Sequence, residues 1–490
     1  MRRDKLRDGL RPAQGGLVVA RVVGAGAPQA PFGRHRLPSG AVHDSTLGKP
    51  NCYREWVHKV GRCKSPRSPF DPVLGEVPLR MPDKLSREAA ERLSRSLHEP
   101  SWLAERRMAA FDVFEKLDPP DPKGEEWRYT DVRRFDFDRF DAPVPTEGLP
   151  ELSPEAAARG VVVTDLWSAA QNHPELLEEH FFTEVPIEEH KFTALHGAFL
   201  SDGVLVYVPK GVEVELPLSI ARRVAGGGSV FPHTTIVVDE LASLTFVDRF
   251  GSKDLSEPSI CASIVEVEAR RGATVNYISL QQWGRSVHHF QTQRFTGQRD
   301  STVRSLAVNL GSAFARTQVE SVLKGEGSFS EMLGLYFADS EQHFAQRTLQ
   351  SHNAAHTTSD LLYKGALKEK SRSEYSGLIK VLRGAQGTDA YQANRNLLLS
   401  EESMARSIPQ LEIEANEVRC THGATVSPVE EEHLFYLMSR GIDRVTAQKL
   451  VVFGFFGDVL DRIRVAEVRE GLSAAIAAKV EGGQSLEVAA

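Results

Sequence analysis

The chain has 490 residues, of which 41% are hydrophobic and 26% are charged, enough for two or three domains with a large buried core. No apolar run approaches the roughly 20 residues of a membrane-spanning helix, and the formal net charge of -7 argues against a general nucleic-acid binder. Four scattered cysteines, Cys52, Cys63, Cys261 and Cys420, are too few for a disulfide framework and indicate a reducing, cytoplasmic location.

Residues 1–80 differ in composition from the rest of the chain. They carry 15 Lys and Arg against 6 Asp and Glu, a net of +9, whereas the remaining residues carry 44 against 60, a net of -16. Without periodic apolar content such a segment cannot offset its ordering entropy, so we expect it to be disordered. The segment has the features of neither a targeting peptide nor a basic nucleic-acid arm. We favour the explanation that the translation start is placed too far upstream and that the true start is Met81.

Residues 81–194 are expected to be mostly helical. Ser86 is a suitable N-cap, and apolar residues at helical spacing between 102 and 114 continue until Pro119 and Pro120. Residues 125–131 form an amphipathic tether, and a further helical stretch includes 174–179.

Residues 195–427 predict a mainly β core. Short strands such as 204–208, 234–238 and 264–268 recur every 8 to 15 residues, separated by turn residues and without helix-length segments between them. A large barrel, paired sandwiches or a strand solenoid all fit this pattern. The coil-length spacing favours the solenoid.

Residues 428–480 return to helical patterns, and 481–490 should fray. A first helix over 429–440 ends at Gly441, Asp443 can cap a second, strongly apolar helix, and a third is expected over 459–480. The apolar faces of the first two helices predict docking, either on the solenoid or on a partner.

The catalytic motifs of several enzyme classes are absent from the sequence. There is no phosphate loop of the form GxxxxGK[ST], so the chain should have no nucleotide site of its own, and there is no CxxC, HExxH or GxSxG. His288 and His289 are adjacent in a strand and point to opposite faces, and His352 and His356 are too far apart in extended chain for one ion.

Cys420 and His422 form the one combination that suggests metal chemistry. In an extended strand they project from the same face, about 6–7 Å apart, so a thiolate and an imidazole could share a soft metal or a cluster iron. Taken alone, this spacing is common and also fits two residues that merely fill a strand. Two ligands cannot complete a site, so the others would come from elsewhere.

Several long motifs resemble the SufB/SufD family of iron–sulfur cluster assembly proteins. They lie at His356, at 359–360 and 364–365, and at 207–212, 388–400, 409–413, 418–427 and 434–442. Within that family the chain is most similar to SufD. Residues 126–130 and 396–400 resemble SufD motifs, and His422 is followed by Gly423 where SufB has Glu. Thr421 stands where SufD usually has Ser, and residues 1–80 have no counterpart in the family.

The resemblance implies a right-handed parallel β-helix between N- and C-terminal helical domains. It implies a non-catalytic scaffold subunit that works with a SufB-like paralogue and a SufC-like ABC ATPase, without a nucleic acid or membrane partner. A transient iron–sulfur cluster or iron would be shared with SufB near Cys420 and His422. The C-terminal helices would bind SufC, and candidate contact residues are Phe435, Tyr436, Arg440, Phe455 and Phe456.

Two alternatives remain open on the sequence alone. The chain could itself be a SufB-like principal cluster scaffold. It could also be a β-helix carbohydrate-active enzyme, although neither a carboxylate cluster nor a signal peptide is visible.

Overall fold

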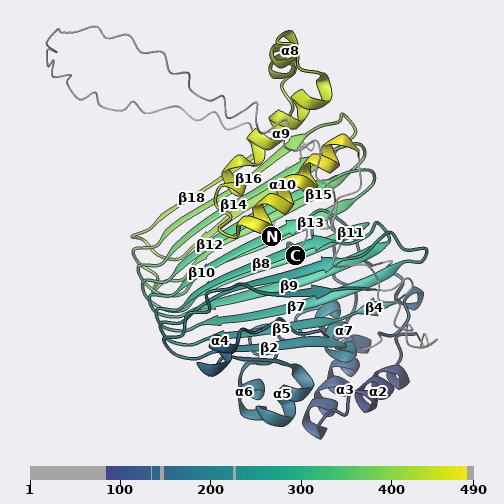
Figure 1. The fold of residues 1–490 in the computed structure, drawn as a ribbon, viewed down its shortest axis with the longest axis vertical. Helices are drawn as coiled ribbons and strands as arrows, with labels where there is room; N and C mark the ends of the chain where they lie inside the picture. The colour runs from purple at the N-terminus through teal and green to yellow at the C-terminus, as the bar shows by residue number, and fades with distance from the viewer. Residues whose placement is uncertain (1–83, 134, 144–147, 225–227, 483–490) are drawn as a thin grey trace, which may run out of the picture. The chain divides into compact units, whose positions relative to one another are not determined.

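The computed structural model of the protein describes residues 84–133, 135–143, 148–224 and 228–482. The predicted disorder of 1–80 and most of the predicted frayed tail lie outside the described residues. The chain within these ranges folds as a mainly β structure with helices before and after it (Figure 1).

The core is a stack of strands that alternate between two sheets. Sheet 1 follows the order β1, β2, β5, β7, β9, β11, β13, β15, β17, with β4 beside β7, and sheet 2 the order β18, β16, β14, β12, β10, β8, β6, β3. The strands of sheet 1 are β1 (Val162–Asp165), β2 (Asp202–Val208), β4 (Ser229–Val230), β5 (Pro232–Val238), β7 (Ser259–Ala269), β9 (Val287–Gly297), β11 (Phe314–Leu323), β13 (His343–His352), β15 (Arg372–Val381) and β17 (Met404–Ile413). Those of sheet 2 are β3 (Leu218–Arg222), β6 (Ser243–Gly251), β8 (Thr274–Gln282), β10 (Thr302–Asn309), β12 (Phe329–Ala338), β14 (Thr358–Leu367), β16 (Asp389–Leu398) and β18 (Arg419–Pro428).

The strand register makes this stack a parallel β-solenoid and confirms the predicted fold class. Phe314 pairs with His343 and His343 with Arg372, always in parallel, so each coil of about 30 residues adds one strand to each sheet. The exception is β1, which pairs antiparallel with β2 at the edge of sheet 1. Strand β1 was not predicted, because four residues between helical segments give no sustained alternation.

Apolar side chains at alternate strand positions fill the space between the two sheets. Buried side chains from both sheets meet there, among them Val206, Phe295, Tyr336 and Tyr363. Gly365 lies opposite Tyr336 in the ladder, and a Cβ at that glycine would lie 2.0 Å from the tyrosine ring. The close approach of ring and backbone therefore requires glycine at this position.

Helices α2, α3 and α7 pack against the outer face of sheet 1, whereas α4 packs against the first coil near β3. Phe111 of α3 and Phe192 of α7 pack in one buried cluster with Phe290 of β9. The Ser86 side chain caps α2, as predicted. The helices are α2 (Arg87–Ser96), α3 (Ser101–Lys116), the 3-10 helix η1 (Phe137–Arg139), α4 (Pro154–Ala158), α5 (Leu166–Asn172), α6 (Pro174–His180) and α7 (Lys191–Phe199).

The C-terminal helices are α8 (Glu431–Ser439), α9 (Arg444–Leu460) and α10 (Ala466–Glu481). The Asp443 side chain caps α9, as predicted, but α9 continues to Leu460, so the third helix begins at 466 and not at 459. Helices α9 and α10 lie across the outer face of sheet 2, where they bury one apolar cluster, and α8 stands clear of the strands (Figure 1).

Candidate functional site

Among the described residues, no further coil is stacked on the last coil of the solenoid. Strands β17 and β18 are the end strands of their sheets, and most of their residues are exposed or half-buried, whereas the preceding strands are largely buried. We call β17 and β18 the open end. Leu411, Ile413 and Val426 are 39–42% exposed there, although each follows the alternation that faces the core in earlier coils. Apolar side chains and unpaired strand edges exposed together are typical of an interaction surface.

Cys420 and His422 lie on β18 with the same orientation. Their ladder partners on β16 are Ala390 and Gln392, both fully buried between the sheets, so the two side chains project on the core-facing side of the last coil. Cys420 is half-buried, whereas His422 is exposed. The same-face arrangement expected from the sequence is therefore present at the open end.

The environment of the Cys420 thiol disfavours its ionisation. Burial raises the pKa of Cys420, and the nearby charge of Asp389 raises it further, while a backbone hydrogen bond from Ala390 acts in the opposite direction. Because a thiolate and not a thiol ligates iron, binding at Cys420 requires loss of this proton. Next to Cys420 on the same side of β18 lies the exposed imidazole of His422, and imidazoles act as proton acceptors and metal ligands in proteins.

Cys420 and His422 are the two candidate metal ligands at the open end. Among the described residues no group of three or more His, Cys, Asp and Glu side chains is arranged to hold a metal ion. Cys261, the other described cysteine, is fully buried on β7 in a separate apolar cluster. Cysteine and histidine are residue types that ligate iron, but two donors do not complete a site, and the remaining ligands would have to come from outside the described residues.

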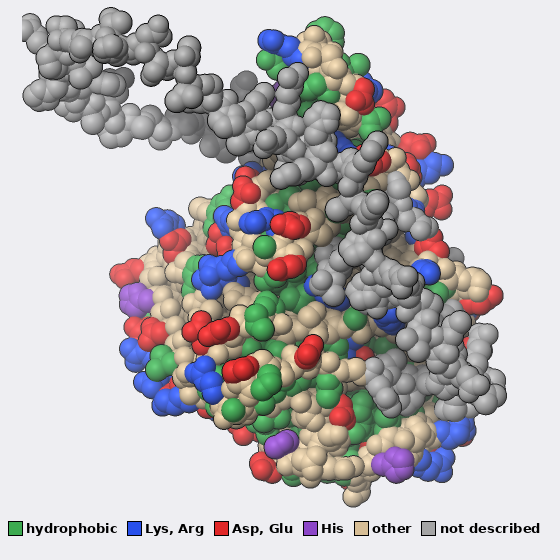
Figure 2. Space-filling model, in the orientation of Figure 1, with side chains coloured by type: hydrophobic (Ala, Val, Ile, Leu, Met, Phe, Trp, Pro, Cys, Tyr) green, Lys and Arg blue, Asp and Glu red, His purple; other side chains and the backbone are tan. Residues whose placement is uncertain are grey.

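The predicted partner-binding residues of the C-terminal region fall into two groups that differ in solvent exposure. On α8, Phe435 is 74% and Tyr436 is 58% exposed, and the Arg440 guanidinium lies 5.2 Å from the centre of the Tyr436 ring. Apolar side chains appear among charged ones at this projecting tip (Figure 2). These three residues are therefore free to contact a partner.

Phe455 and Phe456 do not share that exposure. Phe456 is fully buried in the cluster between α9, α10 and sheet 2, and Phe455 packs at its margin. The Nζ of Lys364 on β14 donates to the Phe455 carbonyl oxygen at 2.6 Å. Phe456 consequently belongs to the internal packing, and the prediction that it lies on a docking surface is wrong. Helical periodicity shows that a face is buried but not what buries it.

A buried lysine anchors α10 on the solenoid. Lys479 Nζ donates to the Phe337 carbonyl oxygen at 2.8 Å and to Gln342 at 3.0 Å, and lies 3.1 Å from Asp339. Burial lowers the pKa of Lys479 to about 8, although Asp339 acts to raise it.

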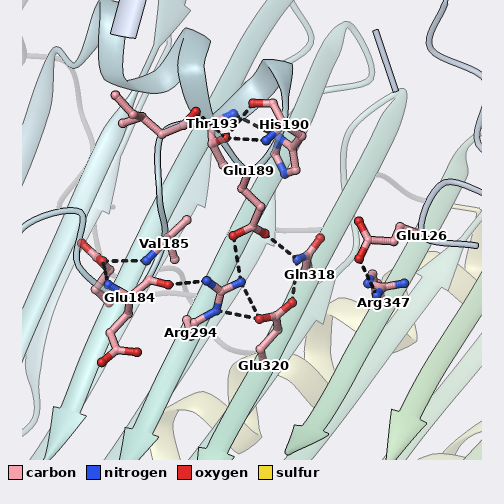
Figure 3. A network of polar contacts seen from close by, with 12 residues as sticks. Glu126, Glu184, Val185, Glu189, His190, Thr193, Arg294, Gln318, Glu320 and Arg347 are labelled. Atoms are coloured by element: carbon pink, nitrogen blue, oxygen red, sulfur yellow. Dashed lines mark hydrogen bonds and ion pairs between the residues drawn. The ribbon is translucent and has the colours of Figure 1, made fainter. Parts of the chain in front are cut away.

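A network of charged side chains joins the N-terminal region to sheet 1 (Figure 3). Arg294 on β9 lies between Glu189, at 2.9 Å, and Glu320 on β11, at 2.6 Å, and Gln318 donates to both carboxylates. Burial lowers the pKa of Arg294, but Glu320 and Glu189 together raise it above its usual value. No sequence pattern predicts these contacts, because the bonded partners are up to 129 positions apart and become neighbours only through the solenoid register.

The predicted tether runs from this network to the open end. Arg316 on β11 stacks on Trp127 with its guanidinium 3.7 Å from the ring centre, and Arg347 on β13 binds Glu126 at 2.9 Å. Further along, Arg406 on β17 lies 4.7 Å from the Tyr129 ring, and Gln410 on β17 donates to Glu125. The segment thus links the N-terminal helices to the penultimate strand.

The two-sheeted solenoid, with helices at both ends and one uncapped coil, places the chain among parallel β-solenoid proteins. Sequence comparison gives the family. The model described as SUF system FeS cluster assembly, SufBD core domain, matches residues 221–455, and that of the SufBD protein N-terminal region matches 149–220. The chain belongs to the SufB/SufD family of iron–sulfur cluster assembly proteins.

Both branches of the family resemble this chain to a similar degree. It is 28% identical over 414 residues to the iron–sulfur cluster assembly protein SufB of Bacillus subtilis, which covers 76% of this chain and 88% of that protein. It is 27% identical over 433 residues to SufD of the same organism, which covers 81% of this chain and 98% of that protein. A SufBD family protein of Staphylococcus epidermidis is 29% identical over 414 residues, with 76% and 88% covered.

Proposed function

We propose that this protein is a SufD-like, non-catalytic scaffold subunit of a SUF iron–sulfur cluster assembly complex. It pairs with a SufB-like paralogue and a SufC-like ABC ATPase in the cytoplasm. Cluster or iron is cargo at the junction with SufB, and neither nucleic acid nor membrane is a partner. Among the described helices none is long and apolar enough to cross a bilayer.

The observation that carries this proposal is the open end with Cys420 and His422 on it. Its exposed apolar residues and free strand edges favour a cap supplied by another chain. A paralogue of the same family fits this role, since a last coil of the same geometry would offer strand edges that match those of β17 and β18. The thiol and the imidazole would then lie at the junction, and the partner would supply the missing ligands.

The assignment to the SufD branch is supported by two features. The alignment to the Bacillus SufD spans 98% of that protein, against 88% for SufB, and His422 is followed by Gly423 where the SufB motif has Glu. The similar identities nevertheless favour one second candidate, in which this chain is itself the principal, SufB-like cluster scaffold.

The ATPase contact is proposed for the projecting helix α8. Phe435 and Tyr436 expose aromatic surface there, and the Arg440 guanidinium lies beside the ring of Tyr436. Aromatic residues with an arginine are the composition typical of interface anchors. The nucleotide chemistry would belong to the ATPase, since this chain has no phosphate loop.

The test is co-purification of the tagged full chain with the SufB-like and SufC-like proteins of its own genome, followed by anaerobic reconstitution. We expect a three-component complex that retains iron and sulfide, and a chain alone that retains little of either. A chain that holds a full cluster without SufB supports the second candidate. Absence of both partners from the purified complex overturns the proposal. Cys420→Ala in the complex should lower the retained iron without dissociating the subunits.

A further inference from the structure

The first coil of the solenoid also has an exposed edge, at the end opposite to Cys420. Strand β3 is the terminal strand of sheet 2, and only β6 pairs with it among the described strands. On sheet 1 the corresponding edge is covered by the antiparallel strand β1. An unpaired edge is a template for an additional strand, so the two sheets differ at this end.

A cleft of about 660 Å³ runs beside this edge, between α4 and the segment 213–219 that leads into β3. Its inner side is apolar, because Leu152 and Ala156 from the α4 region meet Val214 and Leu218. Leu216, at its rim, is 69% exposed. The cleft therefore combines an apolar floor with a free strand edge.

The rim of the cleft is acidic. Glu151 and Glu155 lie on the α4 side and Glu213 and Glu215 on the β3 side, and all four are exposed. None of the four has an ion-pair partner within the residues that the structure describes. The single cation in the lining, Arg159, points to the backbone carbonyl oxygens of Glu213 and Gly211. A second cation, Arg249 on β6, lies next to the lining and donates to Ser219 at 3.2 Å, so four carboxylates stand against two arginines at the cleft.

This charge pattern restricts what can occupy the edge. Nucleic acid and anionic lipid would be repelled by the carboxylates, and a second copy of this chain joined edge to edge would bring Glu213 and Glu215 against the same residues. A cationic segment with apolar residues at alternate positions satisfies both the rim and the floor. In extended form it would also pair with the backbone of β3.

We propose that the edge of β3 and its acidic cleft form a docking site for an extended, basic segment of a partner protein, which adds as a strand to sheet 2. The site is separate from the open end and from α8, so it does not depend on the function proposed above. Alternate Lys or Arg side chains contact Glu213, Glu215, Glu151 and Glu155, and the intervening apolar side chains pack toward Val214 and Leu218.

The test uses the full chain and a short fluorescein-labelled peptide that alternates Lys with Val, measured by fluorescence anisotropy at low salt. We expect saturable binding that weakens with added salt, and no binding of the matched Glu–Val peptide. A Lys–Val peptide with alternate backbone amides N-methylated should bind at least about tenfold more weakly, because it cannot donate to the strand edge. Equal binding of the methylated peptide, or binding of the Glu–Val peptide, overturns the proposal.

A pair of double variants with equal charge change locates the site. Glu213→Lys with Glu215→Lys should weaken the binding of the Lys–Val peptide about tenfold or more, while the thermal melting of the chain stays unchanged because both side chains are exposed. Glu467→Lys with Glu470→Lys, on the exposed side of α10, should leave the affinity unchanged. Equal weakening of peptide binding by both double variants would show a general charge effect and would overturn the proposed site. The proposal would also be overturned if the chain bound to a second copy of itself and the Glu213→Lys, Glu215→Lys variant lost that self-association.

Discussion

Replacing Phe456 by Ala should loosen the C-terminal helices from the solenoid, whereas replacing Phe435 by Ala should not. Phe456 is fully buried among Val452, Val459 and the sheet residues Leu335 and Leu362. Truncation of a buried phenylalanine costs about 3–5 kcal/mol, a large part of the ~5–15 kcal/mol that holds a domain folded. Phe435 is 74% exposed, so its truncation should change stability by no more than about 0.5 kcal/mol.

Urea unfolding and hydrogen exchange together measure this difference. We expect the Phe456→Ala chain to lose exchange protection in α9 and α10 first, since local opening begins where packing is weakest. The Phe435→Ala chain should keep wild-type protection and unfolding midpoint, but should bind the SufC-like ATPase more weakly in a pull-down. An unchanged midpoint for Phe456→Ala would refute the inference that this residue anchors α9, and undiminished pull-down by Phe435→Ala would remove α8 from the ATPase interface.

Three further outcomes are expected. His422→Ala should reduce cluster assembly in cells severely while the purified complex stays intact; a lower melting temperature with undiminished cluster output would instead mean that the imidazole only fills the last coil. Burial lowers the pKa of Lys479 from 10.5 to about 8, so the unfolded chain binds more protons between these values and the stability contributed by this lysine rises with pH across that range. We therefore compare the free energies of unfolding of wild type and Lys479→Met, measured in urea at pH 8 and at pH 10.5. The difference between the two proteins should shift in favour of wild type by about 3 kcal/mol from the lower to the higher pH. A shift in the opposite direction would contradict the lowered pKa of Lys479. Gly365→Ala should lower stability by about 1–3 kcal/mol, because the new methyl group would collide with the Tyr336 ring; Gly384→Ala, where a Cβ meets nothing within 4 Å, is the control in thermal melting.

Local signals in the sequence predicted a mainly β core between helical regions and favoured a solenoid, and the family resemblance specified the parallel β-helix. Ser86 and Asp443 cap helices as expected, because N-capping depends on a side chain and the three residues that follow it. The strand at 204–208 was predictable from its apolar, β-branched composition, and the preference for a solenoid followed from the regular spacing of such strands.

The site was predictable in part. The same-face placement of Cys420 and His422 follows from the period of two in any strand, but their position at an uncapped end depends on where the coil stacking stops. The burial of Phe456 was not predictable, because an apolar helical face is equally suited to a sheet and to a partner. The contacts of Arg294 depend on the register between coils, which no short motif encodes.

The difference between the two ends of the solenoid determines how far an assembly can extend. A head-to-tail contact between identical subunits forms a fibre unless it closes, and a β-solenoid with two bare ends would present such a contact. Here β1 closes one sheet at the first coil, and Glu213 and Glu215 line the edge of the other. Glu412, Glu414 and Glu417 lie on the last coil, although Lys380 of β15 pairs with Glu412. First and last coils of neighbouring copies would thus meet with acidic residues on both sides, which disfavours stacking in one direction. A cap from a different chain, as proposed above, would end the assembly instead of lengthening it.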